Sequence, residues 1–174
     1  MGKGTDAKLY KIELNDMGDH IDISTGDMEL FDRFQETYKQ IADAAKDIPR
    51  RCQEIDKVRV ISGHGNKIVE KIMIKVRFYE ESAEKIDNIF GQGTLKKYFN
   101  KLYKEVPDFM PGAECFIDFY DKMLPVLEEL FGRRVDDSEK ERIRSIGQYI
   151  HFGSHNSGKN KAVTKRRKRR GKKH

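Results

Sequence analysis

The sequence of 174 residues has no Trp, two Cys and four Pro. Cys52 and Cys115 lie far apart and lack the C-x-x-C spacing of a zinc knuckle or a redox pair, so we expect two reduced thiols. No apolar stretch reaches the roughly eighteen residues that cross a membrane, and the N-terminal MGKGTDAKLYKIEL has no apolar signal-peptide core. These absences predict a cytoplasmic protein that is neither secreted nor membrane-spanning.

Recognisable catalytic motifs are also missing. The glycine-rich VRVISGHGNK differs from a phosphate-binding P-loop, because Lys67 is followed by Ile68 instead of Ser or Thr. His151 and His155 have a spacing that lets two imidazoles share a metal, but Phe152 stands where an H-E-x-x-H motif has its Glu. Metal binding by this pair stays an alternative. Our main expectation is a protein with no enzymatic activity, no metal and no cofactor.

What the sequence has in abundance is charge, which makes up 37% of its residues and gives a net charge of +6. Residues 159–174 hold ten Lys or Arg and no acid, whereas residues 1–158 hold 25 basic and 29 acidic residues, a net charge of −4. A mildly acidic body is poorly suited to bind phosphates, so we expect the tail to bind polyanions or acidic partners. The candidate residues are Lys165, Arg166, Arg167, Lys168, Arg169, Arg170, Lys172 and Lys173.

Alternation of apolar and polar residues predicts a small β-hairpin near the N-terminus. Tyr10, Ile12 and Leu14 alternate with charged residues, a turn-rich NDMGD follows, and Ile21 and Ile23 alternate again. We expect residues 1–25 to form a hairpin region packed on a helical body, residues 26–152 to form that helical domain, and residues 153–174 to form a flexible basic tail.

The first helix is predicted after this hairpin, where the apolar period changes from two to between three and four. Its buried face is expected to comprise Phe31, Phe34, Tyr38, Ile41 and Ala45. Ser24, Thr25 or Asp27 is suited to cap its N-terminus. Pro49 is expected to end or kink it near Ile48.

A second, longer helix is predicted over residues 68–89. Its buried stripe is expected to comprise Ile68, Ile72, Val76, Tyr79, Ala83 and Ile86. A strand over residues 72–78 is the alternative, because apolar residues alternate there, but the helical spacing continues further and favours the helix. An aspartate at Ile72 or Val76 should then unfold the domain.

Three further helices are expected over residues 95–106, 113–132 and 138–152. Gly91 or Gly93 is suited to end the long helix, and Thr94 to cap the next one. Pro125 implies a kink, and Gly132 closes its helix. The stripe expected to be buried in the 113–132 helix comprises Phe116, Phe119, Met123, Val126, Leu127 and Leu130. The predicted fold is mainly α, with about five helices, a small N-terminal hairpin and a thin core that a partner or a second copy can complete.

Aromatic residues cluster near the predicted 95–106 and 113–132 helices, with lysines interleaved in the first of them. The aromatic residues are Tyr98, Phe99, Tyr103, Phe109, Phe116, Phe119 and Tyr120, and the lysines are Lys96, Lys97, Lys101 and Lys104. Such a pattern can stack on bases and hold a phosphate backbone. Because Tyr98, Lys101 and Tyr103 cannot share one helical face, we favour a helix pair with an aromatic core and a solvated lysine face.

The chain resembles the tail-assembly chaperones of long-tailed bacteriophages and prophages of Gram-positive bacteria. The resemblance covers about residues 20–135 and is most specific at the F-G-x-G-T junction of residues 90–94, between two amphipathic helical stretches. It implies a non-enzymatic protein of the bacterial cytoplasm that binds the tape-measure protein, often as an oligomer, while the tail tube forms. The basic C-terminal run is not part of that pattern.

Two other functions remain open at this stage. A nucleic-acid-binding protein would use the basic tail, with or without the lysine-rich 95–106 helix, to hold DNA or RNA. A eukaryotic nuclear protein would use KRRKRR as a localisation signal, although such a short motif is easily matched by chance.

Overall fold

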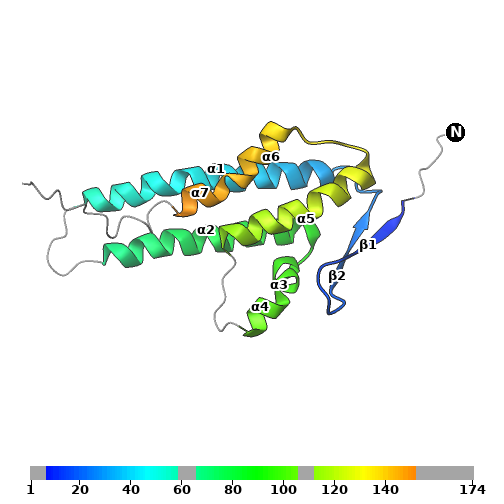
Figure 1. Cartoon of the computed structure of the whole chain (residues 1–174), viewed down its shortest axis with the longest axis horizontal. Helices are drawn as coiled ribbons and strands as arrows, with labels where there is room; N and C mark the ends of the chain where they lie inside the picture. Colours follow the sequence, from blue (N-terminus) through cyan, green and yellow to red (C-terminus); the bar gives the residue numbers. More distant parts are fainter. Residues whose placement is uncertain (1–6, 59–65, 106–111, 152–174) are drawn as a thin grey trace, which may run out of the picture.

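The computed structural model describes residues 7–58, 66–105 and 112–151, without the side chains of residues 102, 103 and 151. The elements are β1 (Leu9–Glu13), β2 (His20–Ser24), α1 (Leu30–Lys57), α2 (Lys67–Phe90), α3 (Thr94–Tyr98), α4 (Asn100–Glu105), α5 (Ala113–Phe131), α6 (Asp137–Arg144) and α7 (Ile146–His151) (Figure 1). The predicted mainly helical fold with a small hairpin is confirmed. Two of the predicted helices are each interrupted once, at Phe99 between α3 and α4 and at Ser145 between α6 and α7.

The N-terminal hairpin pairs β1 and β2 in antiparallel register, with Tyr10 opposite Ile23 and Ile12 opposite Ile21. Ile21 and Ile23 are buried, so this face of the sheet packs on the helices. The turn is held by side-chain hydrogen bonds: Asn15 Nδ2 donates to the carbonyl oxygen of Lys97 at 2.6 Å, which ties the hairpin to α3.

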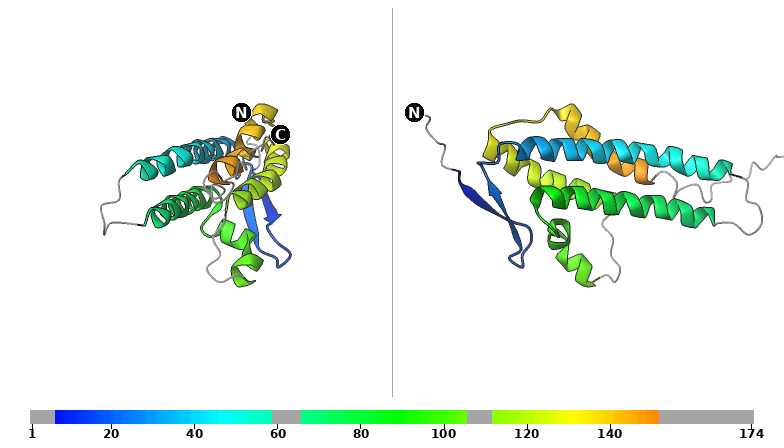
Figure 2. Two further views of the ribbon diagram at one scale, coloured as in Figure 1. Left: turned by 60° about the vertical axis from the view of Figure 1, so that its left-hand side comes forward. Right: turned by 180° about the vertical axis from the view of Figure 1, so that it is seen from behind.

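Helices α1 and α2 form a long antiparallel pair, seen from two sides in Figures 1 and 2. The predicted buried face of α1, from Phe31 to Ala45, is confirmed. Of the two effects predicted for Pro49, the helix end is wrong, because α1 continues to Lys57. Ile48 and Cys52 are buried on either side of Pro49, and their packing offsets the hydrogen bond that the proline removes.

The N-cap position of α1 is none of the three predicted residues. Glu29 occupies it, and its side chain makes no capping hydrogen bond. Asp27 accepts a hydrogen bond from Arg33 Nη1 at 3.1 Å instead. This hydrogen bond lowers the pKa of the Asp27 carboxyl.

The core lies where α5 and α7 pack against α1. The Phe34 ring of α1 stacks on the Tyr120 ring of α5 with centroids 5.4 Å apart, and Tyr38 contacts the same ring at 4.6 Å. The Tyr38 hydroxyl donates to the carbonyl oxygen of Phe116 at 2.8 Å. Burial raises the pKa of Tyr38 well above its usual value and that of Tyr120 to about 12. Both phenols therefore stay neutral and act as packing groups with a polar tip.

The F-G-x-G-T junction turns the chain from α2 into α3. Gly91 and Gly93 have φ angles of 108° and 76°, values that favour glycine. Asp87, in the last turn of α2, accepts hydrogen bonds from the Gly93 N–H at 2.8 Å and the Leu95 N–H at 3.4 Å. The predicted cap at Thr94 is therefore wrong: Gly93 precedes the helix, and a carboxylate from the preceding helix satisfies the free N–H groups.

Helix α5 continues through Pro125 and ends at Gly132, whose φ of 61° confirms the predicted glycine stop. Its buried face includes Tyr120 and Leu124, whereas Val126 and Leu130 of the predicted stripe are only half-buried. The predicted and observed faces therefore differ by a rotation of part of a turn about the helix axis.

A buried carboxylate holds the connection between α5 and α6. Glu128 is 5% exposed, accepts a hydrogen bond from the Val135 N–H at 2.8 Å and forms ion pairs with Arg134 and Lys140. Burial alone would raise the pKa of Glu128, but the Val135 N–H and the two cations outweigh it and hold this pKa below its usual value.

Candidate protein-binding surface

The residues predicted to bind polyanions or acidic partners lie outside the described residues. These are Lys165, Arg166, Arg167, Lys168, Arg169, Arg170, Lys172 and Lys173. His155 and the glycine-rich segment 59–65 also lie outside, so the predicted histidine pair is untested. Within the three described ranges, no group of three or more His, Cys, Asp or Glu residues is placed to hold a metal ion. No helix in those ranges is both long enough and apolar enough to cross a bilayer.

The aromatic residues that the structure describes near α3 and α5 belong to the core. Phe116, Phe119 and Tyr120 are fully buried, and Phe99 is nearly so. Tyr98 packs edge-on against Phe119 with ring centroids 5.2 Å apart, and Lys122 Nζ lies 5.1 Å from the centre of the Tyr98 ring. The core interpretation is confirmed for these side chains, and their faces are occupied by protein.

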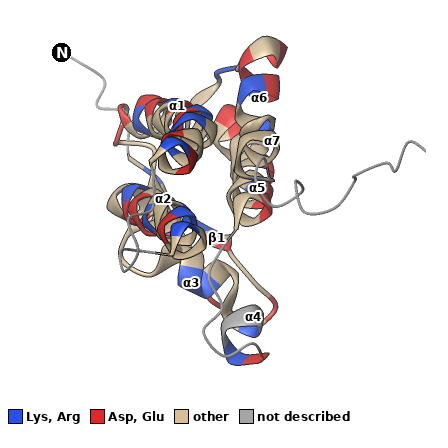
Figure 3. Ribbon diagram, turned by 90° about the vertical axis from the view of Figure 1, so that its left-hand side faces the viewer, with Lys and Arg blue, Asp and Glu red and all other residues tan. Residues whose placement is uncertain are grey.

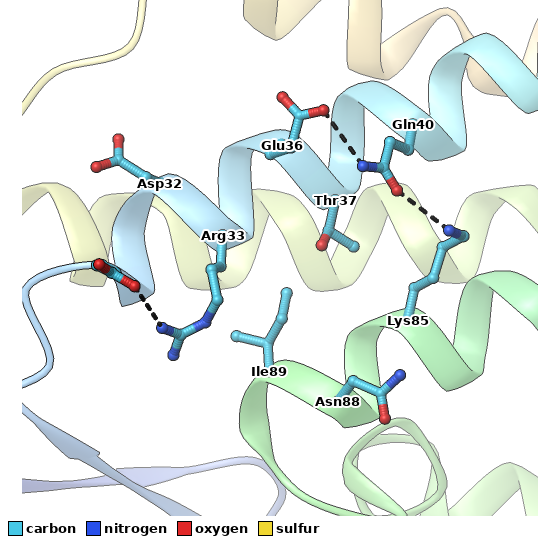
Figure 4. A pocket seen from close by; sticks show the side chains of 9 residues that line it. Asp32, Arg33, Glu36, Thr37, Gln40, Lys85, Asn88 and Ile89 are labelled. Atoms are coloured by element: carbon cyan, nitrogen blue, oxygen red, sulfur yellow. Dashed lines mark hydrogen bonds and ion pairs between the residues drawn. The ribbon is translucent and has the colours of Figure 1, made fainter.

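An open groove between α1 and α2 is lined mainly by polar side chains, several of which bind one another (Figure 4). Gln40 accepts a hydrogen bond from Lys85 Nζ at 3.1 Å and donates one to Glu36 at 3.2 Å. Asp32, at the groove rim, pairs with Arg133 of the loop after α5 at 2.7 Å. Each of these polar groups already has a partner, so the groove acts as a polar seam between the helices.

A second groove lies between the hairpin turn and the α2–α3 junction. Its Asp19 carboxylate accepts hydrogen bonds from Asn15 at 2.8 Å and from Asn100 at 2.9 Å, and these bonds lower the pKa of Asp19. A general acid needs the opposite shift, so this carboxylate is suited to join the hairpin to α3 and α4, not to transfer protons.

The feature that stands apart is an apolar face in the N-terminal half of α2. Ile68 is 67% exposed and Ile72 is 52% exposed, with Val69 and Met73 exposed beside them. The predicted buried stripe is therefore wrong at Ile68 and Ile72, whereas Val76, Tyr79 and Ala83 are half-buried and Ile86 is fully buried. We call Ile68, Val69, Ile72 and Met73 the α2 apolar face.

Two residues of the α2 apolar face, Ile68 and Ile72, have the same orientation as core-facing residues of this helix. Ile68 and Ile86 are 18 residues apart, as are Ile72 and Phe90, and 18 residues make about five complete helical turns. Phe90 packs against Phe34 and Phe119 with ring centroids 5.9 and 5.7 Å apart. One side of α2 therefore carries apolar residues along its whole length, but only the C-terminal half is covered.

The N-terminal half of α2 is uncovered because no third described helix extends along the outer part of the α1–α2 pair. Helix α5 begins at Ala113, where the Phe116 ring lies against Phe78 and Tyr79 with centroids 6.3 and 6.2 Å apart. Figures 1 and 2 show α1 and α2 continuing beyond the ends of both α5 and α7. The α2 apolar face lies on this extension.

Polar contacts hold α1 and α2 together on the same extension. Lys71 Nζ lies 2.6 Å from a carboxylate oxygen of Asp56, and Lys67 Nζ donates to the Asp56 carbonyl oxygen at 2.8 Å. Figure 3 shows basic and acidic residues intermixed along both helices. Lys67 and Lys71 thus contact α1, whereas the side chains of Ile68 and Ile72 are exposed.

Comparison of the chain with known protein families, with characterised proteins and with solved structures finds no match. The α2 apolar face therefore has to be interpreted from its own geometry. Its periodicity was visible in the sequence, but periodicity identifies an apolar side and does not tell whether the chain itself covers that side.

Proposed function

We propose that this protein is a non-enzymatic assembly chaperone that binds an amphipathic helix of a partner protein on the α2 apolar face. The exposure of Ile68 and Ile72, on the side of α2 that is core elsewhere, is the observation that carries the proposal. Following the resemblance to phage tail-assembly chaperones, the partner is the tape-measure protein, held in the bacterial cytoplasm while the tail tube forms.

The geometry favours a helix as the bound segment. The stretch of α2 from Lys67 to Val76 is about 15 Å long at the usual helical rise. A partner helix placed there would occupy the third position of the bundle that α5 fills further along, and would bury its apolar side against Ile68 and Ile72. Because α1 and α2 are already folded as helices along this stretch, little ordering of the binding surface is needed.

A pair of variants tests this function. The double substitution Ile68→Ser and Ile72→Ser removes apolar contact area, whereas Arg77→Ser changes an exposed residue on the side of α2 opposite Ile68 and Ile72. Binding of a labelled helical tape-measure fragment is measured for the full chain by fluorescence anisotropy. Burying each isoleucine contributes about 1.5–3 kcal/mol, so we expect the double variant to bind more than tenfold more weakly.

The control variant should bind as the unchanged chain does. Circular dichroism spectra that match for all three proteins exclude unfolding as the cause. Equal affinities for the double variant and the control would contradict the proposal.

Nucleic-acid binding through the tail is the second candidate, because ten Lys or Arg lie in residues 159–174. Deleting this segment should abolish binding to duplex DNA, and the binding of the full chain should weaken steeply with salt as counterions are released. Binding of the tape-measure fragment should survive the deletion if the α2 apolar face carries the function. Tight, weakly salt-dependent DNA binding by the truncated chain would instead place a nucleic-acid site on the body.

A further inference from the structure

Strand β1 has one paired edge and one open edge. The Thr25 N–H donates to the Lys8 carbonyl oxygen at 3.0 Å, and the Leu14 N–H donates to the Asp19 carbonyl oxygen at 2.7 Å. Backbone groups alternate along an antiparallel strand, so Tyr10 and Ile12 also direct theirs toward β2. The N–H and C=O groups of Leu9, Lys11 and Glu13 therefore point away from β2.

This second edge is open to solvent in the described part of the molecule. Strand β1 lies at the outer margin of the fold, with β2 between it and the helices (Figure 1, and the right view of Figure 2). Leu9 is 69% exposed and Tyr10 is 38% exposed. An open strand edge of this kind readily pairs with a further strand, unless the protein blocks it.

The opposite charges of Lys11 and Glu13 on β1 favour one kind of partner strand. Lys11 and Glu13 lie on the face of the sheet away from the helices, whereas Ile12 lies on the helix-facing side with Ile21 and Ile23. A strand that carries a Lys and a Glu two positions apart is complementary to itself in antiparallel orientation. Opposite charges directly across a strand pair stabilise it, and like charges destabilise it.

We propose that β1 pairs with β1 of a second copy of this chain, around a two-fold axis at Ile12. This register places Lys11 opposite Glu13 of the partner subunit and Ile12 beside its own counterpart. A two-fold axis at Lys11 would place two lysines opposite each other, and an axis at Tyr10 would leave both charges without an opposite charge across the pair. The charge pattern therefore selects the axis at Ile12.

The product is a four-stranded antiparallel sheet with the order β2-β1-β1-β2, related by two-fold symmetry. Such a sheet is more stable than a two-stranded hairpin, and its interface uses the same surface on both copies. The helices lie on the far side of β2, so they leave the β1 edge accessible (Figure 1). The α2 apolar face lies toward the other end of the molecule, and both surfaces can be used at once.

Cysteine cross-linking tests the register. At the proposed axis, the two Ile12 side chains form a pair whose Cβ atoms are about 4.5–5.5 Å apart, close enough for a disulfide after small adjustments. The two Tyr10 positions would be four residues out of register, roughly 13 Å apart. We therefore expect the full chain with Ile12→Cys to form a covalent dimer under mild oxidation, and the chain with Tyr10→Cys not to.

The unchanged chain, which contains Cys52 and Cys115, is the control for other disulfides. No cross-linking of the Ile12→Cys chain above this control would overturn the proposal. Efficient cross-linking through Tyr10→Cys would overturn it as well, because it would show a different register.

A backbone variant tests the hydrogen bonds themselves. Lys11→Pro removes an N–H group that points to the open edge and leaves the hydrogen bonds to β2 intact, whereas Lys11→Ala removes only the side chain. Sedimentation equilibrium should show a dimer for the unchanged chain and a dissociation constant at least tenfold higher for Lys11→Pro than for Lys11→Ala. Circular dichroism should show both variants folded. A monomeric unchanged chain, or equal dissociation constants for the two variants, would overturn the proposal.

Discussion

The two halves of α2 share one apolar periodicity but have different surroundings. In the C-terminal half, Ile86 is fully buried and Phe90 packs against two phenylalanine rings. In the N-terminal half, Ile68 and Ile72 have the same orientation about the helix axis and are exposed. The difference comes from α5, which begins beside Phe78 and Tyr79 and covers only one of the two halves. The apolar stripe of α2 therefore extends beyond the helix that covers it, and its uncovered part is the binding surface that we propose.

The largest expected effect on stability comes from a substitution in the buried core that covers the C-terminal half of α2. Phe34→Ala removes a fully buried ring that contacts Tyr38, Phe90 and Tyr120, and should lower the free energy of unfolding by about 3–5 kcal/mol. Urea denaturation measures this loss. Ile72→Ala, on the uncovered side, should change the free energy by less than about 0.5 kcal/mol. Comparable losses of stability for the two variants would show that Ile72 is not on an uncovered surface.

A second comparison contrasts the buried carboxylate of Glu128 with the exposed ion pair between Asp56 and Lys71. Glu128→Ala leaves the Val135 N–H and Lys140 without their buried acceptor, and should cost about 2–3 kcal/mol. Asp56→Ala breaks the exposed pair with Lys71 and should cost at most about 1 kcal/mol. Thermal unfolding of both variants at neutral pH provides the measurement. A greater loss for Asp56→Ala would mean that the Asp56–Lys71 pair stabilises the fold more than the buried Glu128 does.

Acidic pH should destabilise the protein by protonating the buried carboxylate of Glu128. The pKa of Glu128 in the folded protein lies below its usual value, so its stabilising contribution is present above the unfolded-state pKa. This contribution is lost as the pH falls through the folded-state pKa. The free energy of unfolding should therefore fall less steeply below pH 4.5 in Glu128→Gln than in the unchanged chain. Parallel curves for the two proteins would show that Glu128 does not contribute.

A smaller effect is expected at the junction that follows the covered half of α2. Asp87→Ala removes the carboxylate that accepts the Gly93 and Leu95 N–H groups, and should cost about 1 kcal/mol. Asp87→Asn keeps one acceptor oxygen and should recover part of that loss. Urea denaturation of both variants tests this, and equal losses would show that the capping hydrogen bonds are not the cause.

Much of the fold follows from local sequence patterns. The hairpin, the buried face of α1 and the glycine stops of α2 and α5 depend on alternation, helical spacing and glycine conformation, which act within a few residues. The predictions that α1 ends at Pro49 and that Thr94 caps α3 are wrong because both features depend on groups outside the local turn. Buried neighbours keep α1 helical, and Asp87 caps α3. At both positions, tertiary contacts outweigh the local conformational preference of the sequence.

The candidate surface could be predicted only in part. The spacing of Ile68 and Ile72 identified an apolar side of α2, but the same spacing assigned both residues to the core. Their exposure depends on where α5 begins in space, and no pattern within α2 contains that information. The open edge of β1 likewise depends on which side of the hairpin faces the helices.

The most direct test of the account compares Ile72→Asp with Ile86→Asp in the full chain. The two substitutions are chemically identical and lie in the two halves of the same helix. Ile86→Asp places an unpaired carboxylate in the core, whose cost of several kcal/mol is comparable to the whole stability of a domain, so it should unfold the protein. Ile72→Asp should melt within a few degrees of the unchanged chain and should no longer bind the tape-measure fragment. Equal loss of thermal stability in both variants, measured by circular dichroism, would contradict the account, because it would place Ile72 in the core.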